Sequence, residues 1–88
     1  MRIAVRRTGG LAGIERHAEV DTSTRPDAQE WDALARQVVD EGGAAPPAGV
    51  PDGFRYEVTV DGRTVHLADP GLTDQQRELV TGVLKEGA

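Results

Sequence analysis

The chain of 88 residues contains no cysteine and only three aromatic residues, Trp31, Phe54 and Tyr56. Without thiols it can form neither disulfide bonds nor thiolate metal sites. With so few rings, its core has to be built from Val, Leu, Ile and Ala, and it offers no row of rings on which single-stranded nucleic acid could stack. The length allows one hydrophobic core, so we expect a single domain over residues 1–88.

Positive charge and long apolar runs are also scarce. Fifteen acidic residues outnumber ten basic ones, which gives a formal net charge of −5. A net negative charge repels phosphate backbones and anionic membrane surfaces, so nucleic-acid and membrane binding are disfavoured. No apolar run approaches the ~20 residues that span a bilayer, and the N-terminus lacks the apolar stretch of a signal peptide. We therefore expect a cytoplasmic protein.

Two alternating segments at the start of the chain predict a β-hairpin. Apolar and polar residues alternate over Met1–Arg7 and again over Ile14–Val20, as they do in half-buried strands. Three glycines within Thr8–Gly13 predict a loop between the two strands. Arg16 falls on the apolar parity of the second strand, where we expect a bulge or an edge position.

An amphipathic helix is predicted in the middle of the chain. Pro26 suits its first turn, and the pair Gly42-Gly43 is typical of its end. The proline- and glycine-rich segment Ala44–Gly53 then predicts a loop of restricted conformation. The apolar stripe of the helix consists of Trp31, Leu34, Ala35, Val38 and Val39.

A second hairpin and a second helix are predicted in the last third of the chain. Phe54–Val60 alternates strictly and is the strongest strand signal in the sequence. Asp61-Gly62 favours a two-residue hairpin turn, after which Arg63–Ala68 returns as a strand. Asp69-Pro70-Gly71 ends that strand, and Thr73 with Gln76 has the spacing of a capping box at a helix start.

The element order is therefore ββαββα. We predict an α+β two-layer sandwich, in which a four-stranded antiparallel sheet carries both helices on one face. In this topology Thr8–Gly13, Gly42–Gly53 and Asp69–Leu72 share one rim, and the Asp61-Gly62 turn lies alone at the opposite end. Because loops carry function more often than the scaffold beneath them, we expect that rim to be the working surface.

The sequence indicates no enzymatic chemistry. Ser23 is the only serine and lies in a polar connector, and His17 and His66 lie on separate strands, where we do not expect them to share a metal ion. The glycines of Thr8–Gly13 lead into a strand rather than a helix, which disfavours a phosphate loop. Paired acidic residues fall on outward faces or helix ends rather than in a cleft. We predict no catalytic residue, no metal and no cofactor.

Basic residues gather on the first hairpin. Glu15 and Glu19 lie across from them, so cross-strand ion pairing explains the cluster better than a nucleic-acid surface does. The residues concerned are Arg2, Arg6, Arg7 and Arg16.

The opening M-R-I-A-V-R-R-T-G-G-L-A-G-I-E-R, a strand leading into a T-G-G-[apolar]-A-G-I tip, resembles the emfourin family. The hairpin F-R-Y-E-V-T-V-D-G-R, the segment Leu67–Leu72 and the closing helix also fit that family, although Thr8–Arg16 is the most distinctive part. Emfourins are small bacterial inhibitors of thermolysin-like zinc metalloproteases, the protealysin group in particular. The resemblance implies a cytoplasmic, cofactor-free inhibitor that blocks the active-site region of its protease. The chain is short for the family, with a compact Gly42–Gly53 loop.

A contact hypothesis follows from the resemblance and the residues together. Thermolysin-like enzymes favour a bulky apolar side chain just after the scissile bond, and Leu11 is the only large apolar residue in the Gly9–Gly13 tip. We hypothesise that Leu11 fills that pocket while the main chain of the tip pairs with the cleft wall, a steric block without zinc chelation. The candidate partner-binding residues are Thr8, Gly9, Gly10, Leu11, Ala12, Gly13, Val50, Pro51 and Leu72.

Other functions remain open at this point. A non-enzymatic interaction module, or a regulatory subunit with an unrelated partner, would share the same fold and rim. Assembly through an edge strand is a further option, although we expect the free chain to be monomeric. An enzyme or a small-ligand protein is the reading with the least support in the residues.

Overall fold

The computed structural model describes residues 1–9, 15–42, 53–69 and 71–87. The elements in these ranges follow the ββαββα order, with a short 3₁₀ turn, η1 (Thr22–Thr24), before the first helix. The strands are β1 (Arg2–Gly9), β2 (Arg16–Asp21), β3 (Phe54–Val60) and β4 (Arg63–Asp69), and the helices are α1 (Ala28–Glu41) and α2 (Asp74–Glu86).

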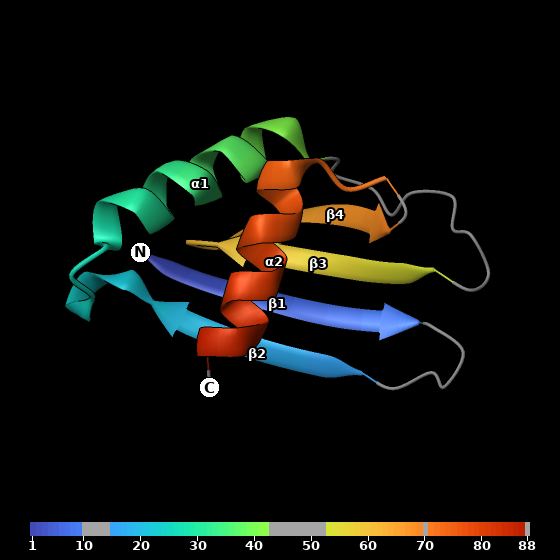
Figure 1. Ribbon diagram of the computed structural model, residues 1–88, viewed down its shortest axis with the longest axis horizontal. Helices are drawn as coiled ribbons and strands as arrows, with labels where there is room; N and C mark the ends of the chain where they lie inside the picture. The colour runs from blue at the N-terminus through green and yellow to red at the C-terminus, as the bar shows by residue number, and fades with distance from the viewer. Residues whose placement is uncertain (10–14, 43–52, 70, 88) are drawn as a thin grey trace.

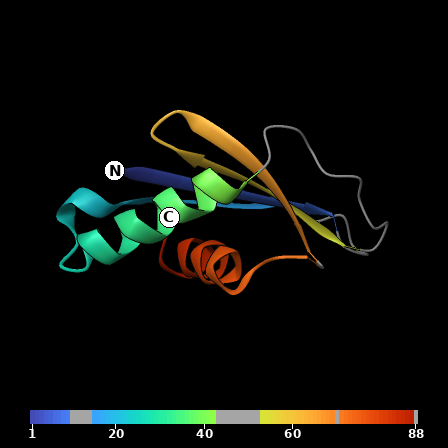
Figure 2. The same cartoon turned by 90° about the horizontal axis from the view of Figure 1, so that it is seen from above.

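The strands form one antiparallel sheet in the order β2-β1-β3-β4 (Figure 1). The first strand is therefore central and pairs on both sides, with β2 and with β3. Both helices pack on the same face of the sheet, and α2 crosses the strand direction (Figures 1 and 2). These observations confirm the predicted two-layer α+β sandwich.

The core lies between the sheet and the helices, and its sheet side consists of apolar residues at alternating positions of the four strands. Trp31, Leu34 and Phe54 are only half-buried and pack at its periphery. The sheet contributes Ile3, Val5, Ala18, Val20, Tyr56, Val58, Val60, Val65 and Leu67, and the helices contribute Ala35, Val38, Val39, Leu79, Val80 and Val83.

The two predicted local motifs of the second half are confirmed. Asp61 and Gly62 have φ values of +48° and +84°, as a primed hairpin turn requires. At the start of α2 the Thr73 hydroxyl accepts from the Gln76 amide at 3.1 Å, and the Gln76 side chain accepts from the Thr73 amide at 2.9 Å. This reciprocal capping box fixes where the helix begins.

The prediction that Thr8 and Gly9 belong to a loop is wrong. Both residues continue β1, where they pair with Arg55 and Phe54 of β3. The predicted alternative of a bulge at Arg16 is also wrong, because the pairing of β1 with β2 advances without interruption to Arg7 opposite Arg16. Arg16 instead lies on an edge strand, the other outcome that its parity allowed.

The Asp61-Gly62 turn does not lie alone at its end of the sheet. The 3₁₀ turn shares that end, since the Thr22 amide donates to the Met1 carbonyl at 2.9 Å. The turn itself is bonded to β1: the Arg2 amide donates to Asp61 Oδ1 at 3.0 Å, and the Asp61 amide donates to the Arg2 carbonyl at 3.2 Å. We call this end the closed end.

Candidate functional site

The end of the sheet opposite the closed end collects the described residues that flank the expected loops. Gly9, Phe54 and Asp69 lie side by side in register across β1, β3 and β4, and Arg7 lies opposite Arg16 on the other side of β1. We call this end the rim, made of Thr8, Gly9, Glu15, Arg16, Gly53, Phe54, Asp69, Gly71 and Leu72.

Most of the described residues that flank the three expected loops lie at one end of the sheet, as predicted. Gly42 is the exception, because a Cβ placed on it would lie 2.6 Å from Cβ of Val65, which belongs to the middle of β4. The segment that follows α1 therefore starts over the sheet, and its Gly53 end alone is described at the rim.

Three of the predicted partner-binding residues are described. Thr8 and Gly9 are half-buried at the end of β1, and Leu72 is half-buried against the core just before α2. The other six lie outside the described residues, and their role stays a prediction; they are Gly10, Leu11, Ala12, Gly13, Val50 and Pro51.

A close backbone approach fixes where the chain leaves β1. Gly9 has a φ of +96°, and a Cβ on it would lie only 2.6 Å from the carbonyl oxygen of Gly53. Both the backbone conformation and the space therefore require glycine at this position. The last residue of the central strand is thus held against the segment that enters β3.

An ion pair links the start of β2 to β1 on the face of the sheet that carries no helix, which we call the open face. Arg6 Nη2 donates to Glu15 Oε2 at 3.0 Å, and Arg6 Nη1 lies 3.7 Å from Glu57 Oε2. The hydrogen bond from Arg6 holds the pKa of Glu15 below its usual range and raises the pKa of Arg6. Both side chains are about half exposed, so solvent screens the pair and its contribution to stability is small.

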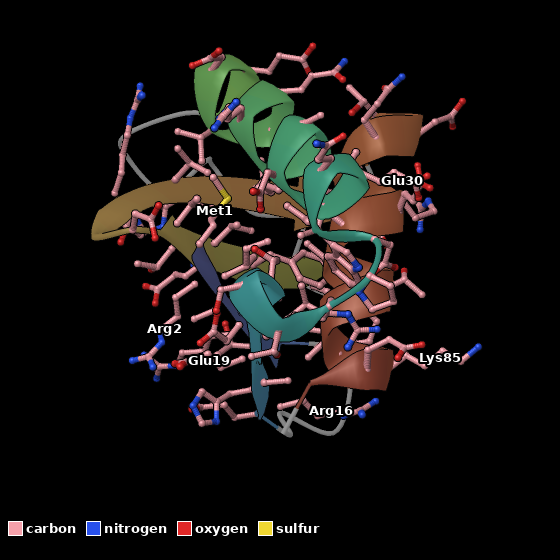
Figure 3. The ribbon with its side chains drawn as sticks, turned by 90° about the vertical axis from the view of Figure 1, so that its left-hand side faces the viewer. Met1, Arg2, Arg16, Glu19, Glu30 and Lys85 are labelled. Atoms are coloured by element: carbon pink, nitrogen blue, oxygen red, sulfur yellow. The ribbon has the colours of Figure 1, made fainter. Side chains whose placement is uncertain are left out.

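Cross-strand pairing is confirmed for the open face only. Arg2 Nε lies 3.0 Å from Glu19 Oε1, and both side chains point away from the helices in Figure 3. Arg7 and Arg16 have the opposite parity and lie on the helix-bearing face, where neither forms an ion pair with a carboxylate of the described residues. The prediction that ion pairs with Glu15 and Glu19 explain all four arginines is therefore wrong for these two.

Arg7 and Arg16 instead line a hollow of about 300 Å³ beside α2, which we call the basic pocket. The Arg7 guanidinium lies 4.6 Å from the centre of the Phe54 ring, and its buried Nε has no hydrogen-bond partner in the described part of the chain. Arg16 Nη2 reaches the Leu84 carbonyl at 3.5 Å. The remaining lining residues are Tyr56, Val80, Thr81, Leu84 and Lys85.

Sequence reasoning missed this pocket, although one signal for it was available. Arg7 and Arg16 share the parity of the core residues Val5 and Ala18, which places them on the helix side of the sheet. The last part of α2 covers them there. The contact of Arg16 with Leu84 joins residues about seventy positions apart in the sequence.

A second hollow, of about 500 Å³, lies between the two helices. Trp31, Leu34 and Gly82 line it together with acidic side chains, and no rim residue contributes to it. At its edge Trp31 Nε1 donates to Asp27 Oδ2 at 2.9 Å. Burial opposes ionisation of Asp27, but the hydrogen bonds from Trp31 and Arg25 outweigh it and hold the pKa of Asp27 below its usual range.

Across the four described ranges, no three His, Asp or Glu side chains gather as a ligand set for a metal ion. His17 on β2 and His66 on β4 lie on opposite edges of the sheet. Neither described helix has the length and apolar character needed to cross a membrane.

The chain is similar to a known protein family. A family model described as Emfourin matches residues 5–84, from the middle of β1 to the last turns of α2. No curated protein and no solved structure matches the chain.

Proposed function

The chain belongs to the Emfourin family, whose members are protease inhibitors, and we propose that it inhibits a thermolysin-like zinc metalloprotease by placing its rim in the active-site cleft. The segment that enters the cleft in this proposal is the glycine-rich connection between β1 and β2. The inhibitor takes no catalytic part, and its free form is a monomeric, single-domain, cytoplasmic protein.

The observation that carries the proposal is how firmly the two described ends of the connection between β1 and β2, Gly9 and Glu15, are held by the sheet. The central strand β1 pairs with β2 up to Arg7 and with β3 up to Gly9, whose close approach to Gly53 fixes where the chain leaves the sheet. On the returning side, Glu15 is tied back to β1 by its bond to Arg6. A recognition segment held at both ends loses little conformational entropy on docking, which favours tight binding.

The same anchoring supports inhibition rather than consumption of the chain as a substrate. If the protease cleaves the connection, the paired strands β1 and β2 keep both new ends in place. In the proposal Leu11 fills the pocket for the residue after the scissile bond, and the surrounding small residues let the backbone enter a narrow cleft. The zinc ion is covered rather than chelated.

A titration against thermolysin-like enzymes, alongside serine and cysteine proteases, tests the function itself. Stoichiometric loss of activity confined to the zinc enzymes would support the proposal. An unaffected panel would refute it and leave an interaction module or regulatory subunit with an unrelated partner.

The Leu11→Ala variant tests the contact hypothesis within that assay. We expect the inhibition constant to rise more than tenfold, corresponding to a hot spot of about 2 kcal/mol. Leu34→Ala is the matched control, because Leu34 lines the hollow between the helices and not the rim. An unchanged inhibition constant for Leu11→Ala would remove Leu11 from the mechanism while leaving the inhibitory function intact.

A further inference from the structure

We propose that the basic pocket of Arg7, Arg16 and Lys85 receives an acidic side chain, Asp or Glu, from the surface of the target protease. This inference rests on the proposed function and adds a second anchor to it. Arg16 and Lys85 both extend on the α2 side of the sheet in Figure 3, away from the ion pair of Arg2 and Glu19.

The lining of the basic pocket carries an excess of positive charge, although Lys85 also borders the hollow between the helices, where acidic side chains lie. Three cationic side chains line it and no carboxylate does, although the chain as a whole carries a net charge of −5. The acidic residues adjacent in sequence are engaged elsewhere: Glu15 pairs with Arg6 on the open face, and Glu86 pairs with Arg25. A local excess of positive charge on an acidic protein is a complementary surface for an anionic group.

A carboxylate bound in the pocket would stabilise both Arg7 and Arg16. Arg7 and Arg16 are direct cross-strand partners on one face of the sheet, a placement in which like charges repel. Arg7 is also oriented in advance by the Phe54 ring, and its buried Nε lacks a partner among the described residues. A carboxylate between the two guanidinium groups would relieve the repulsion and could accept the missing hydrogen bond.

The size and the position of the pocket select the kind of anion. Its volume of about 300 Å³ and its apolar walls from Tyr56, Val80 and Leu84 suit one side chain with an apolar stem and an anionic end. Arg7 and Arg16 lie two positions from Gly9 and one from Glu15, the described flanks of the connection that enters the cleft. A protease that takes up the connection would therefore also face the pocket.

The decisive experiment compares Arg16→Glu with Arg36→Glu against a thermolysin-like protease at about 50 mM salt. Both arginines are exposed and without a carboxylate partner in the described ranges, and both variants change the net charge equally. We expect Arg16→Glu to raise the inhibition constant about tenfold or more and Arg36→Glu to change it less than twofold. Because salt screens charge, the difference should narrow at about 0.5 M salt.

Protein stability provides the second readout. Arg16→Glu places a carboxylate opposite Arg7, so its melting temperature should equal or exceed that of the unchanged chain while inhibition weakens. An inhibition constant for Arg16→Glu within twofold of the unchanged chain would overturn the inference, and so would equal losses in the two variants. An unchanged chain that inhibits no protease of the class would instead defeat the proposed function, and this inference with it.

Discussion

The two ends of the sheet differ in how completely their polar groups are satisfied. At the closed end the fully buried Thr22 hydroxyl bonds to the Met1 carbonyl at 3.2 Å and to Asp32 Oδ1 at 2.7 Å. In the basic pocket beside the rim, Arg7 has a buried Nε without a partner in the described residues and faces a second arginine. Buried polar groups in folded proteins are nearly always paired, and the exception at Arg7 is one of the observations on which the proposed second anchor rests.

The difference separates stability from recognition. Groups at the closed end bond to one another and hold the chain together, whereas Arg7 and Arg16 beside the rim are positioned by the fold without a carboxylate partner among the described residues. Substitutions at the closed end should therefore change the free energy of unfolding alone. Substitutions at the rim should change inhibition, with or without an effect on unfolding.

The sharpest comparison uses two glycines with positive φ, Gly9 at the rim and Gly62 at the closed end. Gly9→Ala adds a Cβ 2.6 Å from the Gly53 carbonyl oxygen, whereas a Cβ on Gly62 meets nothing within 4 Å. We expect Gly9→Ala to destabilise the fold by about 2 to 4 kcal/mol, from backbone strain and overpacking, and to weaken inhibition. Gly62→Ala should lose only about 1 to 2 kcal/mol and keep full inhibition.

Urea unfolding and inhibition constants measured on both variants check this expectation. The comparison of the two ends would fail if Gly62→Ala weakened inhibition as much as Gly9→Ala does, or if the two variants unfolded with equal free energies.

The next effect in size is expected from Thr22→Val at the closed end. Removing the hydroxyl leaves the Asp32 carboxylate without this donor, whereas the Met1 carbonyl keeps the bond from the Thr22 amide, so the substitution should cost about 1 to 3 kcal/mol. Each kcal/mol lowers the melting temperature of a domain of this size by about 4 to 8 °C. The inhibition constant at a temperature where the variant is folded should not change.

Thr24→Val is the matched control, since Thr24 is exposed in the same turn. Its melting temperature should stay close to that of the unchanged chain. A Thr22→Val protein that is fully stable but inhibits poorly would contradict the separation of roles between the two ends.

The smallest effect concerns the protonation of Glu15 at the rim. Its folded-state pKa is lowered by the hydrogen bond from Arg6, so it should titrate below the ~4.3 of an ordinary glutamate. The stability from this bond is present above the unfolded-state pKa and is lost as the pH falls through the folded-state pKa. NMR titration of the carboxyl carbon measures the value directly.

Arg6→Gln should return the pKa of Glu15 toward that of an ordinary glutamate, while Arg2→Gln, which removes the neighbouring pair with Glu19, should leave it lowered. A Glu15 that titrates normally in the unchanged chain would show that this end of β2 is not tied to β1 in solution.

Much of the fold could be predicted because its signals are local. Alternation over Phe54–Val60 gave that strand its observed bounds, and the turn and capping-box residues act within four positions of one another. The end of β1 was misplaced because Thr8 and Gly9 are strand residues only through their pairing with β3. A glycine there is as compatible with a loop as with a close backbone approach.

The candidate site was predictable only in part, for a related reason. Topology alone indicated which connections share an end of the sheet. The basic pocket, however, depends on the path of α2 across the sheet to β2, which brings Leu84 to Arg16. Nothing in the charges of the first hairpin distinguishes arginines that face solvent from arginines that face a helix until that path is known.

The position of the first residue has a practical consequence. Met1 is bonded to Thr22 at the closed end, and the N-terminus lies at the far side of the sheet from Gly9 (Figure 1). A fluorophore, an affinity handle or a sensor-chip linker joined through Met1 would project away from the binding surface. Immobilised in that orientation, the chain would present the rim freely to enzyme in solution.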